Sequence, residues 1–218
     1  MGAIARSAAN LITTSGVVLK GAVNNDSFDN VTALPSSFGD GITLISSQTA
    51  SNSASISFTS GLTSTYKAYK FVFVNIKPIT DDVNFQFNMS TDGGSNYNVT
   101  KTTTSFSAYH NEAGTDTSLG YSTARDLAQS TAFQDLMIGY VGNGADENGS
   151  GSLLLFNPSS TTYVKHFISN INEYNPNNYS SNSFVAGYGN TTSAVNAVRF
   201  QMSSGNISAG TIYLYGIK

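Results

Sequence analysis

The sequence predicts an all-β protein, an antiparallel double-sheet β-sandwich of jelly-roll type with a short N-terminal arm. From residue 42 onward, short runs of alternating or fully apolar residues are separated by clusters of Gly, Asn, Asp, Pro and Ser, which is typical of strands and turns. Only 11% of the 218 residues are charged, while 12 Tyr and 13 Phe supply apolar surface for a core. Several long strands in a chain of this length favour two packed sheets.

Residues 1–40 are expected to form a docking arm, made of a short helix and an extended segment. Apolar residues keep helical spacing near the start, and Gly16 then interrupts the pattern. An isolated helix needs roughly 12 to 15 residues, so we expect this segment to dock on a neighbour. The expected partner interface consists of Ile4, Leu11, Ile12, Val17, Val18 and Leu19. Residues 41–218 are expected to form the sandwich domain.

Periodicity predicts the strands of this domain. They are expected at residues 42–45, 54–58, 68–77, 83–89, 97–103, 136–141, 152–156, 163–171, 184–188, 197–202 and 211–217. The 68–77 run is apolar on both faces, with Val72, Val74 and Ile76 expected to share one of them, so a central strand is expected.

In the 83–89 run, the amide residues alternate with apolar ones, which predicts a wet face opposite a core face. The Asp-Gly-Gly sequence after it, within residues 90–96, predicts a tight hairpin to the next strand. Residues 124–133 have weak helical character, which a single turn between strands would explain.

No constellation in the sequence indicates catalysis, and a non-enzymatic protein is expected. The two histidines, His110 and His166, lie in no nucleophile motif, and His166 reads as a packed or edge residue. The acidic residues fall mainly in turns, where they cap the backbone. The 142–151 loop lacks EF-hand spacing and reads as a flexible loop, so no metal or other cofactor is expected.

Charge and hydropathy also limit the partners. The chain has no Cys, a net charge of -3 and scattered basic residues, so no disulfide framework and no nucleic-acid binding are expected. No apolar run reaches the length of a membrane span, and the first residues lack the apolar core of a signal peptide. We therefore expect no membrane association.

An asparagine-rich loop contains Tyr174, Asn177 and Tyr179, and two interpretations of it stay open. Aromatic faces and amides suit sugar recognition, so these residues are candidate glycan contacts. Alternatively, the tyrosines pack on the rim of the sandwich, since amphipathic Tyr is equally suited to packing and protein contact.

Three segments resemble structural proteins of tailed bacteriophages, in particular those of marine and cyanobacterial hosts. They read FTSGLTSTYKAYKFVF at 58–73, STDGGS at 90–95 and SGNISAGTIYLYGI at 204–217. The resemblance implies a virion protein that is assembled in the host cytoplasm, contacts the major capsid protein or tail proteins, and forms a homo-oligomer such as a trimer.

Within that resemblance, two roles are open. The first is a decoration or cement protein that binds and stabilises the assembled head, because a compact chain without a fibrous shaft fits that role. The alternative is a tail fibre, adaptor or receptor-binding module that contacts host surface glycan.

Overall fold

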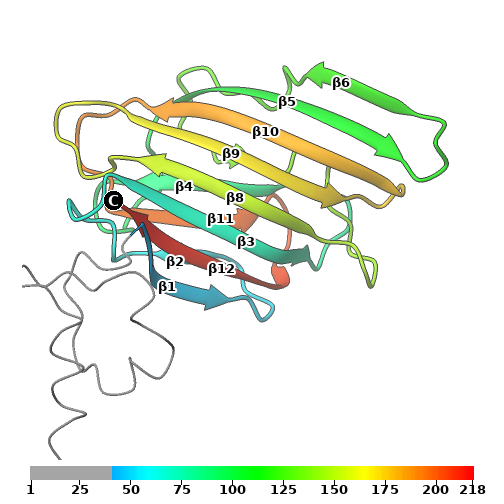
Figure 1. Ribbon diagram of the computed structural model, residues 1–218, viewed down its shortest axis with the longest axis horizontal. Helices are drawn as coiled ribbons and strands as arrows, with labels where there is room; N and C mark the ends of the chain where they lie inside the picture. The colour runs from blue at the N-terminus through cyan, green and yellow to red at the C-terminus, as the bar shows by residue number, and fades with distance from the viewer. Residues whose placement is uncertain (1–40) are drawn as a thin grey trace, which may run out of the picture. The chain divides into compact units, whose positions relative to one another are not determined.

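A computed structural model describes residues 41–218 as an antiparallel β-sandwich of two sheets. The predictions for the arm, including its helix and its interface residues, lie outside the described residues. Within them every regular element is a strand, which confirms the all-β sandwich; the jelly-roll connectivity stays a prediction. Figure 1 shows the smaller sheet lying against one side of the larger one.

The larger sheet has eight strands in the spatial order β1-β12-β3-β8-β9-β10-β5-β6. Their bounds are β1 Ile42–Thr49, β3 Ala68–Pro78, β5 Lys101–Asn111, β6 Thr117–Tyr121, β8 Gly149–Phe156, β9 Lys165–Tyr174, β10 Tyr179–Gly189 and β12 Ile207–Ile217. The smaller sheet has the order β2-β11-β4-β7, with β2 Ile56–Phe58, β4 Phe85–Ser90, β7 Gln134–Asp135 and β11 Ala197–Met202.

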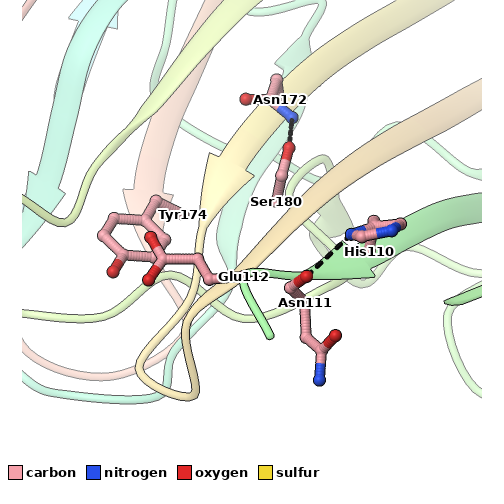
Figure 2. A pocket seen from close by; sticks show the side chains of 6 residues that line it. All are labelled: His110, Asn111, Glu112, Asn172, Tyr174 and Ser180. Carbon is pink, nitrogen blue, oxygen red and sulfur yellow. Dashed lines mark hydrogen bonds between the residues drawn. The ribbon is translucent and has the colours of Figure 1, made fainter. Parts of the chain in front are cut away.

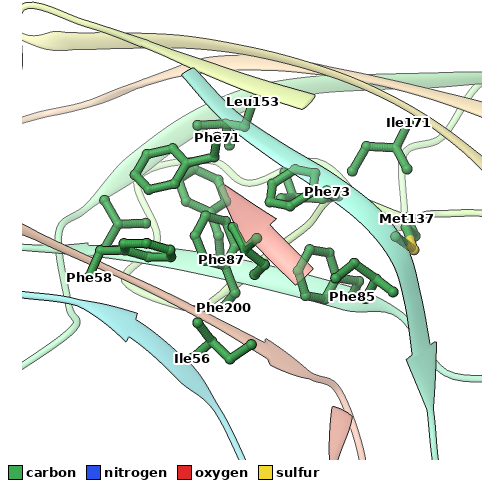
Figure 3. Packing of buried hydrophobic residues seen from close by; sticks show 14 of the residues in the cluster. Ile56, Phe58, Phe71, Phe73, Phe85, Phe87, Met137, Leu153, Ile171 and Phe200 are labelled. Carbon is green, nitrogen blue, oxygen red and sulfur yellow. The ribbon is translucent and has the colours of Figure 1, made fainter. Parts of the chain in front are cut away.

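Phenylalanine side chains from both sheets fill the core between them (Figure 3). Phe200 of β11 is fully buried at the centre, with its ring 5.1 Å from that of Phe71 and 5.2 Å from that of Phe73. Its ring also stacks on that of Phe85 at 5.7 Å. Edge-to-face and offset contacts of this kind favour one mutual arrangement of the rings, so they fix how the two sheets face each other.

A bulge in β3 changes which residues face the core. β3 is an inner strand, as expected, but the prediction that Val72, Val74 and Ile76 share a face is wrong. Asn75 adopts φ 53°, and the pairing with β8 shifts between Phe73 and Ile76. An inserted bulge residue inverts the alternation beyond it, so Ile76 is fully buried while Val74 stays exposed.

The amide face of β4 is not wet. Asn84 and Asn88 are buried, because the segments after β4 and after β6 cover this face of the smaller sheet. Asn88 donates through Nδ2 to the carbonyls of Tyr97 and Thr131 and accepts from Lys101 Nζ at 2.6 Å. Buried amides persist when they are hydrogen-bonded in this way.

The predicted hairpin at 90–96 is also wrong in its pairing. Gly93 and Gly94 do adopt positive φ, and the side chain of Asp92 organises the turn by accepting from Ser90 Oγ at 2.6 Å. That bond, with others from Asn96, lowers the pKa of Asp92 to about 2. The chain then crosses to the larger sheet, where β5 pairs with β10 and β6 and not with β4.

Three further expectations differ from the structure. The expected strand at 136–141 is replaced by the two-residue β7 and a single bridge between Val83 and Val141. β6 was not predicted, because all its residues are exposed and show no apolar alternation. Residues 124–133 contain no helix.

Candidate functional site

The larger sheet has an outer face, formed by the side chains that point away from the smaller sheet. The register places these side chains in rows that cross the strands. One row is Leu44, Tyr215, Lys70, Leu154, Ile168, Ala186 and Thr104. The next is Tyr213, Val72, Ser152, Asn170, Phe184, Phe106 and Tyr121. Within these two rows, Lys70 is the single charged side chain.

Large apolar side chains are exposed on this outer face. Ile168 is 54% exposed, and the ring of Phe106 stacks on that of Phe184 with 4.8 Å between centroids. Amide side chains lie beside them, with Asn170 donating to Asn182 at 3.2 Å. A broad face that combines aromatic, aliphatic and amide groups with almost no charge is typical of interaction surfaces.

The outer face ends at a bare edge strand. β6 pairs with β5 on one side only, and all five of its residues are exposed, including Leu119 at 72%. Its sequence, TSLGY, carries no charge and no Pro. Proteins usually protect such edges with Lys, Pro or a bulge, so β6 is open to pairing with another chain.

The histidines lie on this outer face and are far apart. His166 is exposed on β9, an inner strand, so its interpretation as a packed or edge residue is wrong. Its ring lies 6.0 Å from that of Tyr188, while His110 lies at the far end of β5 and contacts the carbonyl of Asn111. The register separates their rows by eight residues, or about 27 Å, so they share no site.

On the opposite side of β5 and β10 lies an open groove of about 600 Å³, which we call the tyrosine groove. Tyr109, Tyr140 and Tyr179 line it together with carboxylate, amide, hydroxyl and aliphatic groups. The other lining residues are Ser107, Asn111, Asp116, Ile138, Gly139, Asn175, Asn177 and Ser181. The rings of Tyr109 and Tyr179 meet edge to face at 5.4 Å.

Two walls of the tyrosine groove are held by polar contacts. Tyr179 donates its hydroxyl to Asp116 Oδ2 at 2.9 Å, and this bond raises the pKa of Tyr179. On the other wall, the Arg125 guanidinium lies 4.6 Å from the ring centroid of Tyr140 and also hydrogen-bonds the Tyr140 hydroxyl. Arg125 is itself fixed by an ion pair with Asp135 at 3.0 Å.

The backbone at the tyrosine groove adopts unusual conformations. Tyr140 has φ 63° and Asn178 has φ 60°, both in the left-handed region. Asn tolerates this region, but for a bulky residue such as Tyr it costs roughly 1–2 kcal/mol. Strained residues concentrate at functional sites, where the surrounding structure holds them in place.

A buried carboxyl group lies beneath the tyrosine groove. Glu173 Oε1 accepts hydrogen bonds from Gly139 N at 2.8 Å and from Ser183 Oγ at 2.6 Å. Burial raises the pKa of Glu173 to about 8, because these bonds only partly offset the loss of solvent. Glu173 is therefore a neutral acid at pH 7. Its Oε2 and the nearby Ser181 Oγ are both buried without a well-aligned hydrogen-bond partner.

The candidate glycan residues are divided between two sides of the sheet. Asn177 and Tyr179 line the tyrosine groove, whereas Tyr174 lies on the outer side in a hollow of about 260 Å³ beside Glu112 and His110 (Figure 2). Sequence reasoning missed Tyr109 and Tyr140. The alternation in β5 places Tyr109 opposite Ser181 of β10, but no signal in the sequence indicates Tyr140.

The described residues contain no cluster of three His, Asp or Glu side chains that could hold a metal ion. In the 142–151 loop, Glu147 Oε2 accepts from Gly144 N at 2.5 Å, so this carboxylate closes the loop on itself. Across residues 41–218, no helix is long and apolar enough to cross a membrane.

In comparisons with known proteins, no family model, no curated protein and no solved structure matches the chain.

Proposed function

We propose that this protein is a non-enzymatic structural component of a tailed-bacteriophage particle and that it decorates the assembled head. The observation that carries the proposal is the nearly uncharged outer face, which ends at the bare strand β6. The resemblance of residues 58–73, 90–95 and 204–217 to phage structural proteins supplies the particle as the setting.

The outer face is large enough for a specific interface. Eight strands spaced about 4.8 Å apart, with a mean length of about 9 residues rising about 3.4 Å each, cover roughly 1,200 Å². A standard interface buries about 800 Å² on each partner. Exposed Tyr, Phe and Ile side chains and the scarcity of charge match interfaces that form between independently folded proteins.

The proposed occupant of the outer face is the uncharged surface of the capsid shell. A nearly neutral face neither attracts nor repels a charged partner strongly, so recognition has to rest on shape and on hydroxyl and amide hydrogen bonds. Because a shell repeats the same surface many times, modest individual contacts gain strength when neighbouring copies also touch. A protein that binds the assembled shell but not its separate subunits stabilises the shell by mass action.

Binding to stripped heads tests this proposal. Purified protein is added to heads of the cognate phage from which it has been removed, and the bound fraction is measured by sedimentation. Ile168→Lys places a charge at the centre of the outer face and is expected to abolish binding while leaving the fold intact, because this side chain is exposed. Ser204→Lys, in the exposed turn before β12, is the matched control and is expected to bind normally. Equal binding by both variants would overturn the proposal.

A further inference from the structure

The tyrosine groove is a second surface of different chemistry, and the decoration role makes no use of it. It lies on the inner side of β5 and β10, beyond the part of the larger sheet that the smaller sheet covers. Its volume of about 600 Å³ falls within the range of about 300–1,000 Å³ that is typical of ligand sites. Three tyrosine rings give it apolar surface, while amides and hydroxyls converge between them.

The charges of the side chains that line the groove limit the class of ligand. No Lys or Arg side chain lines the groove, and Asp116 adds a carboxylate, so phosphate and other anions are disfavoured. Tyrosine rings pack against the C–H faces of a ligand and keep a polar tip for hydrogen bonding. Asn177 offers both a donor and an acceptor, which matches a ligand whose hydroxyls do the same, whereas the Asn175 amide is engaged with the backbone of Asn177, Tyr179 and Gly139.

We infer that the tyrosine groove binds a neutral saccharide, with Tyr140 and Tyr179 contacting sugar ring faces and Asn177 and Asp116 contacting hydroxyls. This inference does not rest on the decoration role, because the outer face and the groove lie on opposite sides of the larger sheet.

The floor of the groove is closed by Ser181, which is 98% buried. Its hydroxyl is enclosed beside the Glu173 carboxyl, close enough to lower the pKa of that carboxyl. The ligand would therefore contact the exposed tyrosine rings and amides of the walls rather than the floor.

The walls are arranged before any ligand arrives. Arg125 holds the strained Tyr140 by its ring and its hydroxyl, and Asp116 holds Tyr179 by its hydroxyl. Side chains that are already ordered lose little entropy on binding. A ligand that makes only a few contacts can therefore still bind. The strain at Tyr140 is explained if the groove needs its ring in that position.

Saturation-transfer NMR and calorimetry with the full chain test this inference. The probes are hexamers of glucose, mannose, galactose and N-acetylglucosamine, with hexagalacturonate as the anionic comparison and decaproline as a peptide that also suits tyrosine-lined grooves. At least one neutral hexamer is expected to bind at millimolar concentration or better, and hexagalacturonate more weakly. Binding of decaproline alone, or of none of the neutral probes, would overturn the inference.

Variants locate the binding. Tyr140→Ala and Asn177→Ala alter exposed side chains, and the loss of one aromatic contact or of one amide hydrogen bond is expected to weaken binding by about 10-fold. Tyr163→Ala is the matched control, since Tyr163 is 69% exposed and lies outside the groove. It is expected to bind as the unmodified chain does. A neutral saccharide that binds equally to all three variants would place the site elsewhere and contradict the inference.

Discussion

Glu173 makes stability depend on pH, and replacing it by Gln should remove that dependence. Burial raises the pKa of this carboxyl from its ordinary value of 4.5 to about 8. Each pH unit of such a rise corresponds to roughly 1.4 kcal/mol, so ionising Glu173 inside the folded protein costs roughly 5 kcal/mol more than in the unfolded chain. The folded state therefore binds more protons between pH 4.5 and 8, and stability falls as the pH rises through this window.

The expected loss between pH 5 and pH 9 is roughly 4 kcal/mol, as an upper limit, because water entering around the ionised group would reduce it. Glu173→Gln keeps the shape and the acceptor oxygen but cannot ionise. The free energy of unfolding of the variant minus that of the unmodified protein should thus increase by up to this amount from pH 5 to pH 9.

Urea unfolding at pH 5, 7 and 9 measures this difference. The buried amine of Lys101 also titrates in this range, because burial lowers its pKa to about 7, but it is present in both proteins and cancels in the difference. Glu112→Gln, which changes an exposed carboxylate, is the control and should show no such trend. If the difference for Glu173→Gln were constant across the three pH values, Glu173 would not be a neutral acid in the folded protein and the reasoning would be wrong.

Substitutions at three further positions test the packing by urea unfolding. Phe200→Ala is expected to cost about 3–5 kcal/mol, because it empties the centre of the phenylalanine cluster, and a loss below about 1 kcal/mol would contradict that packing. Asn75→Ala should destabilise by about 1 kcal/mol while Asn75→Gly stays within about 0.5 kcal/mol, since Gly accepts positive φ; equal effects would argue against the bulge. Arg125→Gln should cost roughly 2 kcal/mol, because the ion pair with Asp135 is only partly exposed, and no loss would show that pair to be unimportant.

Strand positions could be predicted wherever apolar residues alternate on the core side. The expected strand at 197–202 coincides with β11, since its apolar residues face the core and its turns are clearly marked. β5 was placed too early and too short. Its inward residues include Lys101, Thr103 and Ser105, which face a covering segment rather than the phenylalanine core and give no apolar period.

Whether a face of a strand is exposed to solvent or covered by another segment could not be predicted from the sequence of that strand alone. Asn84 and Asn88 read as solvent-facing because amides usually are, but a segment distant in sequence covers them and supplies their hydrogen bonds. The bulge at Asn75 could not be predicted from the sequence either, since Asn occurs in many strands without adopting positive φ.

Only some of the residues that line the tyrosine groove could be predicted from the sequence. The asparagine-rich segment indicated Asn177 and Tyr179, but Tyr174 is the last residue of β9, where alternation places it on the other side of the sheet. Tyr140 reaches the groove only through its left-handed backbone and its contact with Arg125, and neither leaves a local pattern. The burial of Glu173 could not be predicted either, because it occupies an inward position of β9 that a charged residue rarely takes.

The proposed role depends on where the protein lies in the particle and which face it presents, and cryo-electron microscopy of intact phage measures both. We expect many symmetry-related copies over the head, each with the outer face of its larger sheet against the capsid shell. A few copies confined to the tail, or copies on the head whose outer face points to solvent, would contradict it.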